Sequence, residues 1–192
     1  MSVQVQSSSH PLGQHWLYSP AGNRSYQEFS EQLAVVASAL PEHRYMLNLC
    51  EDRGQFMQAF AAAQLRGQTV LLPSSRSPGA LLEIAEDYPD CYALSDELVV
   101  PKGILSVTFD ALTSAAVMER RFPEDIPDKH TAALVFTSGS TGRPKAHAKT
   151  WGSLSHGVTL VCERFGFGPD TAIVATVPPQ HMYGLELSLI HI

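Results

Sequence analysis

Short apolar segments alternate along this chain with segments whose apolar residues recur at the spacing of a helix. Strands are expected at 45–50, 69–72 and 91–94, with a weaker candidate at 104–109. Repeated strand–helix–strand units with short connections favour parallel pairing of the strands. The sequence therefore predicts an α/β fold, in which a mostly parallel sheet, or sheets, is flanked by helices.

Start and stop signals mark the helices between these strands. Ser25 and Glu28 have the spacing of a capping box, and Pro41 marks the end of the helix that follows. A second helix is expected to end near Gly67, and Ser77 begins a third. The helical spacing in these segments comes from Phe29, Leu33, Val36, Ala37 and Leu40, from Phe56, Ala59, Phe60 and Ala63, and from Leu81, Leu82, Ile84 and Ala85.

The second part of the chain continues the pattern. An apolar strand is expected at 132–136, then a helix that Gly166 ends, a strand at 171–177 and the start of another helix beyond it. Two prolines and mixed charges make 123–130 a candidate linker. The expected organisation is a flexible N-terminus (1–15), a first α/β subdomain (16–122), the linker (123–130) and the start of a second α/β subdomain (131–192).

Composition excludes several classes of protein. Of the 192 residues 44% are hydrophobic, and 13 Lys and Arg stand against 19 Asp and Glu, for a net charge of -6. A nucleic-acid surface would need a broad basic face, so we expect no nucleic-acid partner. No apolar run approaches the ~20 residues that cross a bilayer, so no membrane span is expected. The cysteines Cys50, Cys91 and Cys162 form no C-x-x-C pair and are expected to be reduced thiols in a cytoplasmic protein. The histidine spacing predicts no metal cage built from protein alone.

The residues from Thr137 to Lys145 read T-S-G-S-T-G-R-P-K and follow directly on an expected strand. Glycine tolerates positive φ and lets another group approach the backbone closely, so Gly139 and Gly142 suit a tight loop. Successive N–H groups in such a loop form an anion-binding concavity, and the hydroxyls add further donors. Lys145 supplies a mobile positive charge. This arrangement fits the binding of a polyphosphate.

Two other loop motifs fail on spacing. A P-loop needs four residues between its glycines and Ser or Thr after its Lys, and a nucleophile elbow needs G-x-S-x-G. Charge also favours an anion site, because the sequence has no acidic residue between Asp128 and Glu163. The basic residues and histidines in that stretch are Lys129, His130, Arg143, Lys145, His147, Lys149 and His156.

The ten residues from Phe136 to Lys145 resemble the signature of the adenylate-forming superfamily, which includes acyl-CoA synthetases, aryl-acid ligases, luciferases and nonribosomal-peptide adenylation domains. The pattern, an aromatic residue followed by T-S-G-[ST]-T-G-x-P-K, matches without a gap. Two weaker elements precede it in the family's order, S-Y-Q-E-F from Ser25 and L-R-G followed by V-L-L-P up to Pro73. The resemblance implies part of the large N-terminal domain of an adenylate-forming enzyme.

This resemblance implies ATP-dependent activation of a small carboxylic acid. The carboxylate attacks the α-phosphorus of ATP, pyrophosphate leaves, and the acyl-adenylate then reacts with a thiol of coenzyme A or of the phosphopantetheine arm of an acyl carrier protein. Positioning and charge stabilisation dominate such catalysis. The resemblance assigns the phosphates to Thr137, Ser138, Gly139, Ser140, Thr141, Gly142 and Lys145, a catalytic role to Lys145, and Mg²⁺ to Thr137.

A second patch reads V-P-P-Q-H-M-Y-G and ends at Gly184. His181 and Gly184 have the spacing of the family's H-x-x-G element, which lies beside the acyl or aryl part of the substrate. The resemblance implies that His181 is catalytic, orienting the carboxylate and neutralising negative charge, with an acid–base role left open. It places the substrate against His181, Met182, Tyr183 and Gly184. Without the glycine-rich run, an ordinary hydrogen-bonded histidine would be the better interpretation of His181.

The chain also departs from the family pattern. Ala146 and His147 follow Lys145, where the family usually has Gly-Val. The family's adenine-contacting segment, its Y-G-x-T-E-like element, its ribose-binding Asp and the catalytic Lys of its C-terminal domain are not in this sequence. We therefore expect an N-terminal fragment, inactive or nearly so without the missing C-terminal portion of the same enzyme. Two alternatives stay open: a stand-alone or decayed nucleotide- or anion-binding module, and an unrelated α/β protein that uses the loop structurally.

Overall fold

A computed structural model describes residues 14–19, 22–96, 100–114, 125–137, 144–168 and 171–189. The strands are β1 (His15–Leu17), β2 (Arg24–Ser25), β3 (Tyr45–Asn48), β4 (Thr69–Leu72), β5 (Cys91–Ser95), β6 (Leu105–Thr108), β7 (Thr131–Thr137) and β8 (Lys145–Thr150). The helices are α1 (Tyr26–Ala39), α2 (Arg53–Leu65), α3 (Pro78–Asp87), α4 (Phe109–Thr113), α5 (Trp151–Phe165) and α6 (Met182–Leu189).

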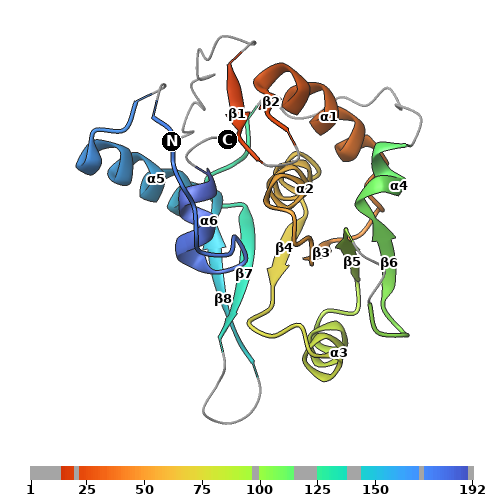
Figure 1. The fold of residues 1–192 in the computed structure, drawn as a ribbon. Coiled ribbons are helices and arrows are strands. Elements are labelled where there is room, and N and C mark those ends of the chain that lie inside the picture. Colours follow the sequence, from red (N-terminus) through yellow and green to blue (C-terminus); the bar gives the residue numbers. More distant parts are fainter. Residues whose placement is uncertain are drawn as a thin grey trace.

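The centre of the structure is a six-stranded sheet with the order β6-β5-β3-β4-β7-β8 (Figure 1). Neighbouring strands from β6 to β7 are parallel, and β8 pairs antiparallel with β7 at the edge. β1 and β2 form a separate antiparallel pair. The predicted α/β fold with a mostly parallel sheet flanked by helices is confirmed.

Each face of the sheet carries its own hydrophobic core, because successive side chains of a strand point to opposite faces. Met46 and Val70 pack on one face with apolar residues of α1, α2, α4, α5 and α6. Leu47 and Leu71 pack on the other face with Ile84 of α3. We call these the α2 face and the α3 face of the sheet. The N-terminal pair β1–β2 adds a smaller cluster against α1 and α2, in which Trp16 is buried.

Local signals in the sequence set several helix ends as predicted. The Ser25 hydroxyl accepts from the Glu28 N–H at 3.2 Å, and the Glu28 carboxylate accepts from the Ser25 N–H at 2.6 Å, which completes the capping box of α1. Such a cap contributes about 1 kcal/mol. Gly166 ends α5 with φ 66°, a left-handed conformation that glycine adopts without steric cost.

The structure corrects three expectations. The predicted strand at 171–177 is wrong, because this segment pairs with no strand among the described residues. Its side chains alternate between half-buried and exposed as in a strand, but the main-chain oxygen of Ala175 accepts a hydrogen bond from the side chain of Arg53 in α2. The strand expected at 104–109 ends at Thr108, which caps the unpredicted helix α4. β8 was also not predicted, although Lys, His and Lys alternate with Ala along it.

The boundary proposed at 123–130 does not interrupt the sheet, because β4 from before it pairs with β7 from after it. The division into two subdomains stays a prediction.

Cys50, Cys91 and Cys162 form no disulfide. Cys50 and Cys91 are buried, and Cys162 is half-buried. Burial raises the pKa of the Cys50 and Cys91 thiols. Within the described residues, no helix has the length and apolar character that crossing a membrane requires. A cytoplasmic location stays a prediction.

Candidate functional site

The hairpin of β7 and β8 carries the two ends of the glycine-rich run. Thr137, the last residue of β7, pairs directly with Lys145, the first residue of β8, and both are exposed. A hydroxyl and an ammonium group therefore project from neighbouring strands at the loop end of the hairpin. The structure does not describe the other predicted phosphate ligands, Ser138, Gly139, Ser140, Thr141 and Gly142.

The loop end of this hairpin lies at the carboxyl edge of the parallel strands. β7 runs parallel to β4, so Thr137 emerges at the same edge as the end of β4. Asp52 and Arg53, which cap and begin α2, follow the carboxyl end of β3. Open α/β sheets bind ligands outside the carboxyl ends of their strands. The position of Thr137 in the sheet thus matches the position of a ligand site.

Three basic side chains of β8 share one face of the hairpin. Residues directly opposite each other in antiparallel strands have their side chains on the same face. His147 pairs with Val135, which packs into the core of the α2 face. Lys145 and Lys149 lie two residues to either side of His147, so all three lie on that face. We call Lys145, His147 and Lys149 the basic row. No ion pair between described residues involves it.

A side-chain contact joins the basic row to the end of β7. His147 Nε2 lies 3.3 Å from Thr137 Oγ1 across the hairpin, within hydrogen-bond distance. Either tautomer of the imidazole completes this contact, because a threonine hydroxyl both donates and accepts. The contact therefore connects His147 to the Thr137 hydroxyl, which the resemblance assigns to Mg²⁺ and phosphate.

The locally positive stretch of the sequence does not form a single site. Lys129 and His130 precede β7 and so lie roughly 20 Å from its carboxyl end, at 3.3 Å per strand residue. His130 is half-buried, with Nε2 3.1 Å from Gln64 Oε1, and burial lowers its pKa. These contacts give His130 a structural role. The basic row is the part of the charge pattern that lies beside the predicted phosphate ligands.

The H-x-x-G element forms the start of α6. A Cβ atom on Gly184 would lie 2.1 Å from the main-chain oxygen of Pro178, so glycine is required by this close approach. Met182 and Leu185 pack into the core of the α2 face, whereas His181 and Tyr183 are exposed. The structure thus places the H-x-x-G element over the same face of the sheet as the basic row (Figure 1).

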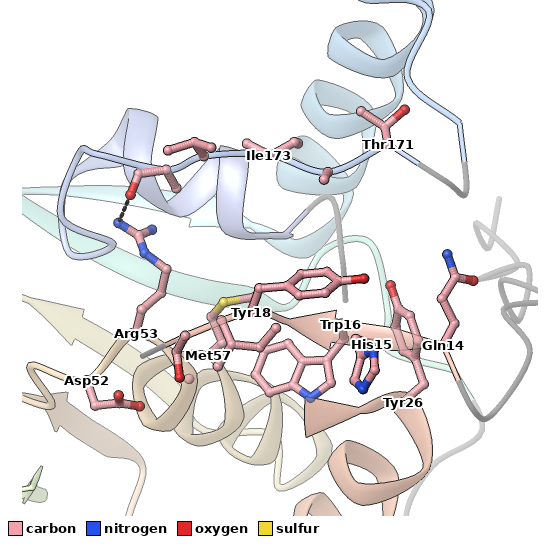
Figure 2. A pocket seen from close by; sticks show the side chains of 16 residues that line it. Gln14, His15, Trp16, Tyr18, Tyr26, Asp52, Arg53, Met57, Thr171 and Ile173 are labelled. Atoms are coloured by element: carbon pink, nitrogen blue, oxygen red, sulfur yellow. Dashed lines mark hydrogen bonds between the residues drawn. The ribbon is translucent and has the colours of Figure 1, made fainter. Parts of the chain in front are cut away.

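Arg53 fixes the segment that leads to α6. Its Nη2 donates to the main-chain oxygen of Ala175 at 3.2 Å (Figure 2). It also donates to the main-chain oxygen of Val177. Burial lowers the pKa of the guanidinium, which stays charged at any physiological pH. Arg53 is not among the residues predicted from the sequence, because its partners lie 122 and 124 residues further along the chain. No local pattern signals such a contact.

A separate cavity of about 490 Å³ lies between β1, the start of α2 and residues 171–175 (Figure 2). Trp16, Tyr18 and Met57 supply much of its apolar wall, and Gln14, Tyr26 and Asp52 supply polar groups. Its described lining includes none of the predicted site residues. This cavity was not predictable from the sequence, because its walls come from three distant segments.

The donor set at the hairpin end fits the ligands that the resemblance implies. A hydroxyl paired with an ammonium group suits an anionic phosphate chain. Among the described residues, no group of three or more His, Cys, Asp or Glu could hold a metal ion. Mg²⁺ commonly keeps waters and substrate phosphates as ligands and takes few from the protein, so a single oxygen from Thr137 is compatible with it.

Fold and donor set together define an α/β protein with groups suited to a phosphorylated ligand at the carboxyl edge of its sheet. The family comparison is more specific. The chain belongs to the family of AMP-binding enzymes, whose model matches residues 14–191.

Curated relatives and solved structures agree with this membership. A dimodular nonribosomal peptide synthase of Bacillus subtilis is 33% identical over 102 residues, which cover 50% of this chain and 4% of the relative. A 2-succinylbenzoate–CoA ligase of Bacillus cytotoxicus is 28% identical over 120 residues, covering 62% of this chain and 24% of the ligase.

The o-succinylbenzoate CoA synthetase of Bacillus subtilis has a similar fold. Its complex with an acyl-adenylate intermediate matches 93% of this chain and 50% of that one, with a TM-score of 0.82 and 21% identity. Its complex with ATP and magnesium matches 88% of this chain and 48% of the solved chain, with a TM-score of 0.75 and 21% identity. At these identities the likeness establishes the fold. The chain spans about half the length of these solved chains and less of the curated relatives.

Proposed function

We propose that these residues are the N-terminal part of an AMP-forming acid–thiol ligase. The observation that carries this proposal is the direct pairing of Thr137 with Lys145 at the carboxyl edge of the sheet, at the two ends of the family signature. Membership of the AMP-binding family supports it, as do relatives named CoA ligase and peptide synthase.

In this proposal the hairpin end holds the β- and γ-phosphates of ATP. The Lys145 ammonium neutralises phosphate charge, and the Thr137 hydroxyl donates to a phosphate or ligates Mg²⁺, which offsets charge on the phosphates when it is bound. The residues Ser138, Gly139, Ser140, Thr141 and Gly142 complete the loop. A carboxylate attacks the α-phosphorus of ATP, pyrophosphate leaves, and the acyl group of the resulting acyl-adenylate passes to the thiol of coenzyme A or of a carrier protein with release of AMP. Fixed donors that stabilise developing charge account for most of the catalysis.

The acid is proposed to bind against the start of α6. Gly184 packs tightly against Pro178 and so sets the position of the exposed His181. From there His181 orients the carboxylate and offsets its charge, while Met182, Tyr183 and Gly184 contact the rest of the acid. Because the chain spans about half of the solved relatives, we propose that further residues of the same enzyme complete the site and that these 192 residues alone turn over little or nothing.

Calorimetry of Mg·ATP binding tests the phosphate site. We expect Lys145→Ala to weaken binding at least about tenfold, since a charge-assisted hydrogen bond contributes about 1.5–3 kcal/mol. The matched control is Lys129→Ala, which removes the same charge at the opposite end of β7 and should leave the affinity unchanged. Equal affinities in all three proteins, or no binding by a demonstrably folded wild-type chain, would refute a phosphate site formed by these residues alone and would leave the family membership in place.

A further inference from the structure

His147 occupies a position where the resemblance leads one to expect an aliphatic residue. The family pattern usually continues Gly-Val after the motif lysine, and this chain has Ala146 and His147. Ala146 is partly buried and packs against the core of the α3 face, so packing accounts for its apolar side chain. The His147 ring is exposed on the opposite face, where packing does not require an imidazole.

The register of the hairpin explains how His147 reaches Thr137. Thr137 lies opposite Lys145, and His147 lies opposite Val135, so Thr137 and His147 are diagonal neighbours on one face. Diagonal neighbours in a sheet have Cα atoms roughly 7–8 Å apart, which only a long side chain can bridge. The imidazole spans this gap and brings Nε2 to 3.3 Å from Thr137 Oγ1. The valine of the family pattern could not make this bond.

The contact selects one orientation of the threonine. Rotation of Thr137 about χ1 exchanges the places of its hydroxyl and its methyl group, and an exposed threonine at a strand end has more than one staggered rotamer available. A hydrogen bond to His147 favours the rotamer that places the hydroxyl on the face of the basic row. The hydroxyl is then already oriented beside Lys145 before a ligand arrives.

We propose that His147 is a positioning residue of the phosphate site, which acts by holding the Thr137 hydroxyl in its binding rotamer. This inference rests on the proposed function, because it assigns the oriented hydroxyl to Mg·ATP. Preorganisation of a binding group raises affinity by removing the entropy lost when the group is ordered on binding. His147 is therefore a feature of this chain that strengthens nucleotide binding without itself contacting the nucleotide.

The first experiment measures the Thr137 rotamer without any ligand. Three-bond couplings to the Thr137 γ-methyl, measured by NMR on the full 192-residue chain, should report one dominant rotamer in the wild type. His147→Val should give averaged couplings. His147→Gln, whose amide nitrogen can replace Nε2, should restore the single rotamer. His156→Gln, at an exposed histidine of α5, is the control. Unchanged couplings in His147→Val would overturn the inference.

The second experiment asks whether His147 acts through Thr137. We expect His147→Val to weaken Mg·ATP binding about three- to tenfold, the range for one hydrogen bond, and His147→Gln to retain most of the affinity. In a Thr137→Val background, His147→Val should not weaken Mg·ATP binding further, because both substitutions remove the same Thr137–His147 hydrogen bond. Additive losses, or a Gln variant as weak as the Val variant, would overturn the positioning role.

The two experiments separate failure of the inference from failure of the proposed function. A wild-type chain with a single Thr137 rotamer that binds no Mg·ATP would refute the phosphate site proposed for these residues, and the His147 contact would then be structural only. A chain that binds Mg·ATP with an affinity independent of His147 would refute the inference and leave the proposed function in place.

Discussion

Arg53, the first residue of α2, donates a hydrogen bond to the main-chain oxygen of Val177, 124 residues further along the chain. A second bond from the same nitrogen reaches Ala175. Segment 171–177 pairs with no described strand, so the guanidinium satisfies backbone carbonyls that a sheet neighbour would otherwise satisfy. The contact ties the carboxyl edge of β3 to the segment that leads into the H-x-x-G element.

Removal of this side chain should release segment 171–177. We expect Arg53→Met to lower the free energy of unfolding by about 1–2 kcal/mol, because two carbonyls lose a charged donor while the apolar stem is kept. Hydrogen exchange at the amides of 174–177 should accelerate. Arg164→Met, at an exposed arginine of α5, should change neither quantity by much. Unaltered exchange at 174–177 in Arg53→Met would show that the segment is held by other contacts.

The close approach of Gly184 to Pro178 allows a sharp test of the packing at α6. Gly184→Ala would place Cβ 2.1 Å from a backbone oxygen, and we expect a loss of about 1–3 kcal/mol in the free energy of unfolding. Gly157→Ala in α5 is the control, since its Cβ would meet only a side-chain atom at 3.9 Å. That change should be neutral or stabilising by about 0.5–1 kcal/mol. Urea unfolding measures both, and equal stabilities would contradict the structure.

The stability of the fold should depend on the protonation of His130. Burial lowers its pKa in the folded protein, so below about 6.5 the unfolded chain binds this proton more readily than the folded chain does. The stabilising contribution is present above the unfolded pKa and is lost as pH falls towards the folded pKa. Urea unfolding between pH 7.5 and pH 5 should show the loss. His130→Gln should reduce this pH dependence and His156→Gln should not; the reverse result would contradict the structural role of His130.

The cysteines should differ in their reactivity towards a thiol reagent. Burial raises the pKa of the Cys50 and Cys91 thiols, and the thiolate is the reactive form. Cys162 is only half-buried. We expect Ellman's reagent to label one thiol rapidly and the other two only on unfolding, with the rapid phase absent from Cys162→Ser. Rapid labelling of a second thiol in the folded chain would contradict the burial of the core cysteines.

Much of the fold was predictable, because local signals agree with tertiary packing there. The capping box at Ser25 and the apolar strand 69–72 each specify an element without reference to the rest of the chain. Segment 171–177 shows the limit of such signals. Its alternation is that of a strand, but a strand also needs a neighbour, and local sequence does not say whether one is present.

Sequence patterns point to part of the candidate site, whereas contacts between residues distant in the chain leave no such pattern. The Thr137–Lys145 run and the H-x-x-G spacing are short motifs, and the sequence alone was enough to find them. The Arg53 contacts and the cavity beside Trp16 depend on residues that are distant in the sequence and adjacent in the fold, so no local pattern predicts them. The His147 contact depends on the register of a strand that the sequence analysis did not predict.

The central claim is that nucleotide binds at the loop end of the β7–β8 hairpin and not in the cavity beside Trp16. Titration of the ¹⁵N-labelled chain with Mg·ATP, followed by NMR, tests this most directly. We expect the largest shift changes at the amides of Thr137, Lys145 and His147, with little change at the Trp16 indole or at 171–175. Changes centred on Trp16 and 171–175, with the hairpin unaffected, would contradict it.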